Sequence, residues 1–172
     1  VDVLGNVVRE YTTRLRYEAG PRDESGRLAY GPDPIVIDEP RLHHEVAFPL
    51  PNGNFLALGM EVRTVAGFPD RTCGADDPLP DGPRPIRADR IIEFTPEGEV
   101  VHRISLADSL DPVTQQGVRM CETKTDDLVV EGDFVDWTHA NSATLFEDQN
   151  AVLVSARNIN SVMMCGLLTC RI

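Results

Sequence analysis

Hydrophobic and polar residues alternate along most of this chain in short runs, and sequences typical of tight turns separate the runs. Turn signals occur at residues 5–6, 51–54, 96–99 and 147–150. Between them, residues 100–106 alternate as a half-buried strand would. No stretch has a convincing helical period, and the best candidate, residues 85–92, is short and contains β-branched residues. The pattern predicts an all-β fold.

A repeat within the chain narrows the fold prediction further. Residues 3–11 match residues 96–104, with Gly5 and Gly98 offset by 93 positions, and His44 and His139 are offset by 95. Each unit then has an outer hairpin that turns at glycine, a long loop, and an inner hairpin that opens with histidine. This arrangement is typical of β-propeller blades, whose inner strands line a central channel.

The chain has sequence for about two blades, whereas propellers close with roughly four to eight. We therefore expect residues 1–172 to form a partial propeller domain, with blade-like repeats at about 1–88 and 89–172. The long loops near 20–40 and 67–88 are rich in proline, glycine and aspartate, and we expect them either to cover the mouth of the channel or to be partly disordered. Missing blades or other chains would be needed to close the ring.

Composition excludes several classes of partner. With 172 residues, 41% of them hydrophobic, the chain is long enough for one domain with a buried core. A formal net charge of −12 argues against binding to nucleic acid or to an anionic membrane surface. No apolar run approaches the ~18 residues that span a bilayer. The start of the chain has neither the basic leader nor the apolar core of a targeting peptide.

The cysteines leave two interpretations open. They form no CxxC motif and lack zinc-like spacing with the histidines. Disulfides in an oxidising compartment and free buried thiols are both compatible with the positions Cys73, Cys121, Cys165 and Cys170.

Candidate chemistry gathers around residues 136–142 and the strand predicted at 151–158. His139 and Asn141 are two residues apart and should share a strand face, and Arg157 should reach the same place from the next strand. The repeat adds His44 to this site. Its neighbour His43 should point the opposite way, so we prefer His44 and expect no metal site. Histidines, an amide and an arginine suit a tetrahedral anion such as a sulfuryl or phosphoryl group.

The same residues carry a family resemblance. The hairpin that contains His44 and residues 50–54, the motif at residues 136–142, and Arg157 eighteen residues after His139 resemble the arylsulfate sulfotransferases. The resemblance spans most of residues 1–160. It implies a six-bladed propeller, export to the periplasm or beyond, and transfer of a sulfuryl group from a phenolic sulfate ester to a phenol. It implies no cofactor, because these enzymes need no nucleotide sulfate donor.

The resemblance also assigns roles to individual residues. His139 is similar to a family active-site histidine and Arg157 to the arginine that contacts sulfate. Asn141 is similar to an accompanying polar group, and His44, with His43 as the second choice, to the histidine of the earlier blade. The family mechanism is ping-pong through a sulfated histidine from a later blade. No histidine follows His139 in this chain, so we expect that nucleophile to come from outside it.

Two other functions remain in view. One is a propeller hydrolase, such as a sulfatase or an esterase, and the other is a non-catalytic propeller scaffold. A transferase accelerates with added phenol, a hydrolase does not, and a scaffold shows no turnover.

Overall fold

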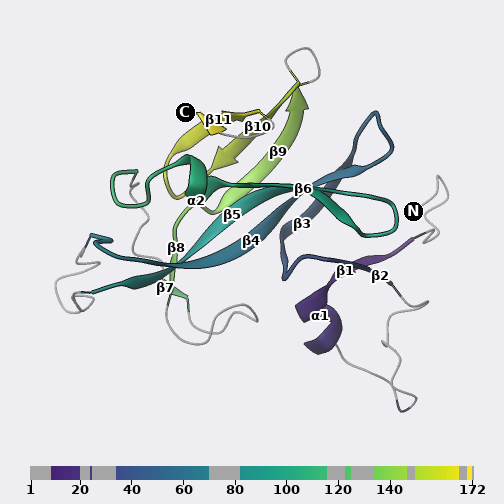
Figure 1. Ribbon diagram of the computed structural model, residues 1–172, viewed down its shortest axis with the longest axis horizontal. Helices are drawn as coiled ribbons and strands as arrows, with labels where there is room; N and C mark the ends of the chain where they lie inside the picture. The colour runs from purple at the N-terminus through teal and green to yellow at the C-terminus, as the bar shows by residue number, and fades with distance from the viewer. Residues whose placement is uncertain are drawn as a thin grey trace.

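The computed structural model describes residues 9–19, 24, 34–69, 82–115, 123–124, 134–146, 150–166 and 170–171. Over these residues the fold is β-rich, with two short helices, so the all-β prediction is confirmed (Figure 1). The helices are α1 (Arg14–Ala19) and α2 (Leu106–Ser109). The strands are β1 (Tyr11–Thr13), β2 (Ile35–Ile37), β3 (Leu42–Pro49), β4 (Phe55–Val65), β5 (Arg84–Phe94), β6 (Val100–Ser105), β7 (Thr123–Lys124), β8 (Phe134–Asp136), β9 (Ala140–Phe146), β10 (Ala151–Ala156), β11 (Ser161–Cys165) and β12 (Cys170–Arg171).

The larger sheet is built on a meander of four consecutive strands. Strands β3, β4, β5 and β6 pair antiparallel in chain order, and β4 and β5 remain paired from Phe55–Phe94 to Val65–Arg84. Strand β5 then pairs in parallel with β8, which pairs antiparallel with β7. The sequence argued against a helix at residues 85–92, and this stretch lies inside β5.

The second sheet is a meander of the same kind. Strands β9 to β12 pair antiparallel in the order β12-β11-β10-β9. A four-stranded antiparallel meander is the unit from which propeller blades are made. The division into repeats at 1–88 and 89–172 stays a prediction.

The main core joins the two sheets, which lie one above the other in Figure 1. Strand β5 contributes Ile86 and Ile91, and the second sheet contributes Val154 and Met163. Trp137, between β8 and β9, is fully buried in this cluster, and its indole N–H donates to the Gln115 carbonyl at 2.9 Å. This shared core fixes the end of β8 and the start of β9 against β5.

Two short helices depart from the expectation of no helix. Helix α2 follows β6 directly, and the last residue of β6, Ser105, caps the helix by accepting a hydrogen bond from the Asp108 amide at 3.2 Å. Most residues of the two long loops near 20–40 and 67–88 lie outside the described residues. Cys73 and Cys121 also lie outside them. The described parts of the two loops include β2 and the first residues of β5. No helix in the described ranges is long and apolar enough to cross a membrane.

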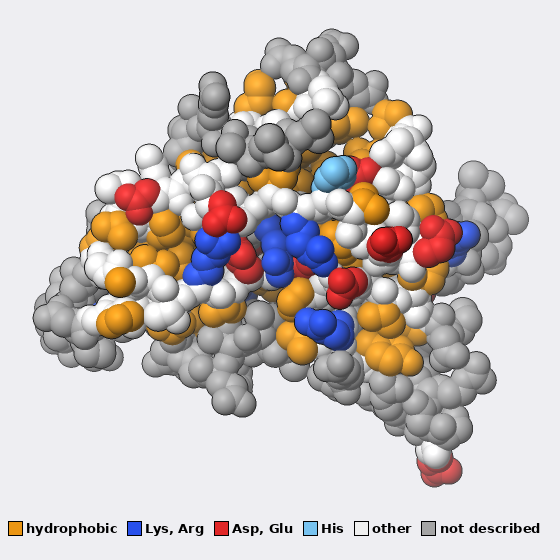
Figure 2. Space-filling model, in the orientation of Figure 1, with side chains coloured by type: hydrophobic (Ala, Val, Ile, Leu, Met, Phe, Trp, Pro, Cys, Tyr) orange, Lys and Arg blue, Asp and Glu red, His pale blue; other side chains and the backbone are white. Residues whose placement is uncertain are grey.

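A buried carboxylate ties the segment before β3 to the larger sheet. Glu39 is fully buried, and its two oxygens accept from Arg90 Nε at 2.5 Å and Arg103 Nε at 3.3 Å. Basic and acidic side chains lie next to one another across the middle of the face shown in Figure 2. Because Glu39 is buried and bonded by both arginines, we assign it a structural role.

The glycine turn between β5 and β6 gives a prediction about stability. Gly98 has φ +90°, and a Cβ there would lie 2.6 Å from the Val36 carbonyl oxygen. Gly53 has φ +87°, but a Cβ there would meet nothing within 4 Å. Gly98→Ala should therefore lower the free energy of unfolding by about 2–4 kcal/mol, through backbone strain plus overlap. Gly53→Ala carries the backbone strain alone, ~1–2 kcal/mol. Urea denaturation of both variants measures the difference, and equal losses would contradict the close approach to Val36.

Candidate active site

Three histidines from distant parts of the chain meet at one place. His43 and His44 belong to β3, and His139 immediately precedes β9. The ring centroids of His43 and His139 are 4.7 Å apart, those of His44 and His139 are 5.3 Å apart, and those of His43 and His44 are stacked at 4.2 Å. The structure thus corrects the expectation that His43 and His44 point in opposite directions.

The backbone explains why simple strand alternation fails here. His44 has φ +58° and His139 has φ +46°, both in the left-handed region that non-glycine residues seldom adopt. The pairing of β3 with β4 is irregular between Leu42 and Ala47, which interrupts the alternation next to His44. Each left-handed residue costs roughly 1–2 kcal/mol, so the packing around both histidines must hold them there. Strained backbone of this kind often occurs at functional sites.

Asp89, on β5, holds His43 and the chain around His139 together. Its Oδ1 lies 2.5 Å from Nδ1 of His43. Its Oδ2 accepts from the Thr138 hydroxyl at 2.7 Å and from the Ala140 amide at 2.5 Å, and the Asp89 amide donates to the Thr138 oxygen at 2.8 Å. The carboxylate is buried. It therefore links one histidine to the loop that carries another.

Asp136 holds the ring of His139 and links it to Arg87 on β5. Its Oδ2 lies 2.5 Å from Nδ1 of His139 and 2.6 Å from the Nη2 of Arg87, and its Oδ1 accepts from Arg87 Nε at 3.1 Å. All three side chains are buried. Because an ionised carboxylate only accepts hydrogen bonds, it favours the proton on Nδ1 and leaves Nε2 as the basic nitrogen of His139.

Arg157 stands beside this loop, anchored by its own backbone and by a buried neighbour. Its amide donates to the His139 carbonyl at 3.1 Å, and its Nε donates to the Asn158 side-chain oxygen at 3.0 Å. Asn158 is fully buried and donates in turn to the Asp136 carbonyl at 2.5 Å. The arginine predicted from sequence is thus attached to the segment that carries His139.

The comparisons with known proteins give one clear result. The arylsulfotransferase (ASST) family model matches residues 1–171. The chain belongs to the arylsulfotransferase family. The recognition made from the sequence motifs is confirmed, and membership indicates a sulfotransferase-type enzyme family. No curated protein and no solved structure matches the chain.

In this member of the arylsulfotransferase family, loss of contact with water lowers the pKa of both His44 and His139, although His44 is still exposed. For His44, nearby His43 and His139 lower the pKa further. For His139, the hydrogen bond to Asp136 raises the pKa but does not outweigh burial, and the positive charge of Arg157 acts with burial. Burial alone would raise the pKa of Asp136, yet its hydrogen bonds and ion pair with Arg87 bring it below the usual value. At neutral pH the two histidines are therefore neutral beside an ionised carboxylate.

The structure gives Asn141 a different setting from the one expected. Asn141 is exposed on β9, at a bulge where Ala140 pairs with Ala156 and Ser142 with Ser155. Because the backbone of His139 is left-handed, strand alternation starts only after it, and the argument for a shared face fails. A role for Asn141 in the site stays a prediction.

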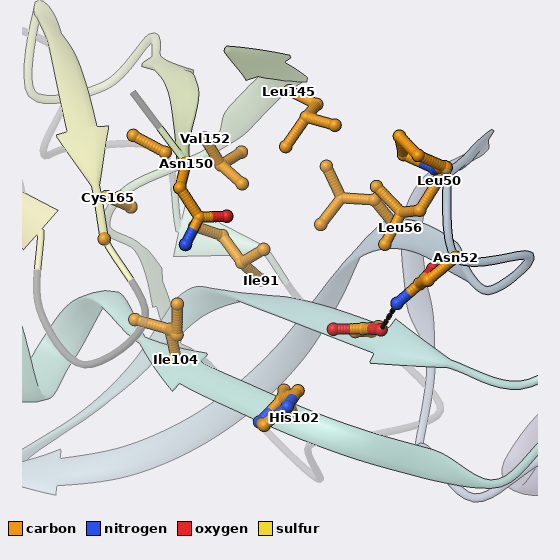
Figure 3. A pocket seen from close by; sticks show the side chains of 14 residues that line it. Leu50, Asn52, Leu56, Ile91, His102, Ile104, Leu145, Asn150, Val152 and Cys165 are labelled. Atoms are coloured by element: carbon orange, nitrogen blue, oxygen red, sulfur yellow. Dashed lines mark hydrogen bonds between the residues drawn. The ribbon is translucent and has the colours of Figure 1, made fainter. Parts of the chain in front are cut away.

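A separate pocket lies away from the five candidate residues. It has a volume of about 330 Å³, and none of the five lines it (Figure 3). Its wall is largely aliphatic, with side chains such as Leu56, Ile91 and Val152, and His102 lies at its edge. Glu93 in its wall accepts hydrogen bonds from Asn52 and Asn54. The pocket therefore offers apolar contact but no set of reactive groups.

Sequence reasoning missed the residues that position the histidines. Asp136 lies in the motif at residues 136–142, three residues before His139, but the sequence alone assigns it no role. Asp89 and Arg87 lie on β5 at buried positions. Their signal was the presence of charged residues among the apolar residues at 85–92, a stretch whose strand was not identified from the sequence.

Proposed function

We propose that this chain is part of an enzyme that transfers a sulfuryl group from an aryl sulfate ester to a phenolic acceptor. The observation that carries the proposal is the meeting of His43, His44 and His139 beside Arg157. Family membership supports the same class of reaction. The proposal needs no nucleotide cofactor.

Each residue has a role that its surroundings suit. The Arg157 guanidinium supplies donors and positive charge for the sulfuryl oxygens. The Nε2 of His139, left basic by Asp136, can accept the phenolic proton of the acceptor and return one to a departing phenolate. His44, exposed on the open side of the cluster, can bind the oxygens or share the proton transfer.

The reaction has two balanced halves. A histidine nitrogen attacks sulfur, the bond between sulfur and the aryl oxygen breaks, and the phenolate leaves with a proton. A second phenol then loses its proton, attacks the sulfur of the sulfohistidine, and frees the histidine. In this proposal the sulfated histidine comes from outside residues 1–172, supplied by further blades or by another chain. The ordered charge of the site would lower the barrier to both halves.

The fold and the compartment are proposed on two further grounds. The two four-stranded meanders, β3–β6 and β9–β12, would be blades of a six-bladed propeller with the histidines facing its channel. Cys165 is disulfide-bonded, which supports a periplasmic or secreted location.

Acceptor dependence tests the proposed function. With 4-nitrophenyl sulfate as donor, the natural gene product should release 4-nitrophenol several-fold faster when a second phenol is added, and a sulfated form of that phenol should accumulate. A rate independent of the added phenol, with inorganic sulfate as product, would support the hydrolase instead. Absence of turnover under both conditions would support the scaffold.

A further inference from the structure

We propose that His43, His44 and His139 form a three-histidine binding site for a divalent transition metal ion, with zinc as the best-suited ion. Each histidine offers one ring nitrogen, and the three nitrogens lie within 4.8 Å of one another. The sequence had argued against a metal because adjacent strand residues face opposite ways, and the left-handed backbone of His44 removes that objection.

The ring nitrogens of the three histidines are close enough to bind one metal ion after a small movement of the His44 side chain. Zinc binds histidine nitrogens at about 2.0–2.1 Å, so the nitrogens of a tetrahedral site lie ~3.3 Å apart. His43 and His139 are buried and held, whereas His44 is exposed. A rotation of the His44 side chain can therefore bring its nitrogen toward the other two without disturbing the core.

The hydrogen bonds behind the rings match those of histidine metal sites. Metal-binding histidines almost always donate the proton of their other nitrogen to a carboxylate, a carbonyl or water. Here Nδ1 of His43 lies 2.5 Å from Asp89, and Nδ1 of His139 lies 2.5 Å from Asp136. The Nε2 atoms of both rings are thereby left for a metal. Two of the three histidines therefore already have the carboxylate partner that metal-binding histidines commonly have.

Neighbouring charged side chains both oppose and favour the binding of a cation at the three histidines. The guanidinium of Arg157 disfavours a cation, since its positive charge acts on His44 and His139. The two buried carboxylates of Asp89 and Asp136 supply compensating negative charge within the same cluster. Three histidine ligands would leave the fourth tetrahedral position of a zinc ion open, whereas structural zinc sites are closed by four protein ligands.

The site does not rest on the proposed sulfuryl transfer. A bound ion would occupy Nε2 of His139, the nitrogen that the transfer uses as a base, so metal binding and sulfuryl transfer would exclude each other at this residue. The test of the site requires no substrate. The chain has four histidines, so His102, exposed on β6, is a matched control outside the cluster. Zinc alone is titrated into the metal-free protein in competition with a chromophoric chelator, and cobalt binding is followed by visible absorption. No described cysteine is a free thiol that would compete for these ions.

We expect one zinc per chain in the wild type and in His102→Ala. His44→Ala should weaken the affinity by more than the about 10–100-fold that loss of an outer hydrogen-bond partner typically costs. His139→Ala should do the same, with circular dichroism checking that it folds. Because His44 is exposed, its variant keeps the test decisive if His139→Ala does not fold. Equal affinity in the wild type and His44→Ala, or an equal loss in His102→Ala, would overturn the proposal.

Discussion

Replacing His139 with alanine is expected to lower sulfuryl transfer by about two to four orders of magnitude, the usual contribution of a positioned general acid or base. The ring of His139 is held in place by a chain of buried contacts: its Nδ1 lies 2.5 Å from Asp136, and Asp136 is ion-paired with Arg87. Removing the imidazole takes away the proton carrier and leaves the Asp136 carboxylate without one partner. Initial rates with a saturating phenol acceptor measure the effect.

His102→Ala is the control for this variant. His102 lies in β6, outside the cluster, and its loss should leave the rate near that of the wild type. Thermal unfolding of both variants separates a lost proton carrier from lost folding. A near-wild-type rate in folded His139→Ala would remove this residue from the proposed mechanism.

Replacing Asp89 with alanine should lower the free energy of unfolding by about 3–5 kcal/mol, the loss typical when one partner of a buried charged network is removed. Asp89 accepts hydrogen bonds from the His43 ring, the Thr138 hydroxyl and the Ala140 amide, and all of these groups are buried. Without the carboxylate, three buried donors lose their acceptor, and the link between β5 and the start of β9 is lost.

Asp108→Ala supplies a matched carboxylate at the surface. Asp108 also pairs closely with an arginine, Arg63, at 2.5 Å, but its side chain is 68% exposed. An exposed pair contributes about 0–1 kcal/mol, so this variant should be nearly as stable as the wild type. Chemical denaturation of the two variants gives the comparison. Similar small losses in both would show that the Asp89 network does not hold the site together.

Much of the fold followed from local sequence, because strand alternation and turn chemistry are local properties. Strands β6 and β10 were readable from hydrophobic runs, and the turn before β6 was readable from Gly98. The parallel pairing of β5 with β8 was not, since it joins residues about 50 positions apart and leaves no local pattern. Helix α1 spans six residues, too few to show a helical period.

The sequence identified most of the residues of the candidate site but did not predict how their side chains are arranged. The histidines and Arg157 were found because their motifs are unusual, but alternation placed His43 on the wrong side. The left-handed backbone of His44 and His139 is held by tertiary contacts, which sequence does not display. Asp89 was missed for the same reason, because its partners are 46 to 51 positions away.

The central claim is that the sulfuryl group passes from one phenolic oxygen to another, and following the group itself tests it most directly. An aryl sulfate carrying a heavy sulfur isotope is incubated with the natural gene product, a phenol acceptor and unlabelled inorganic sulfate, and the products are weighed by mass spectrometry. Our account predicts that the heavy sulfur appears in the ester of the acceptor. Heavy sulfur found entirely in inorganic sulfate, or left entirely in the donor, would contradict it.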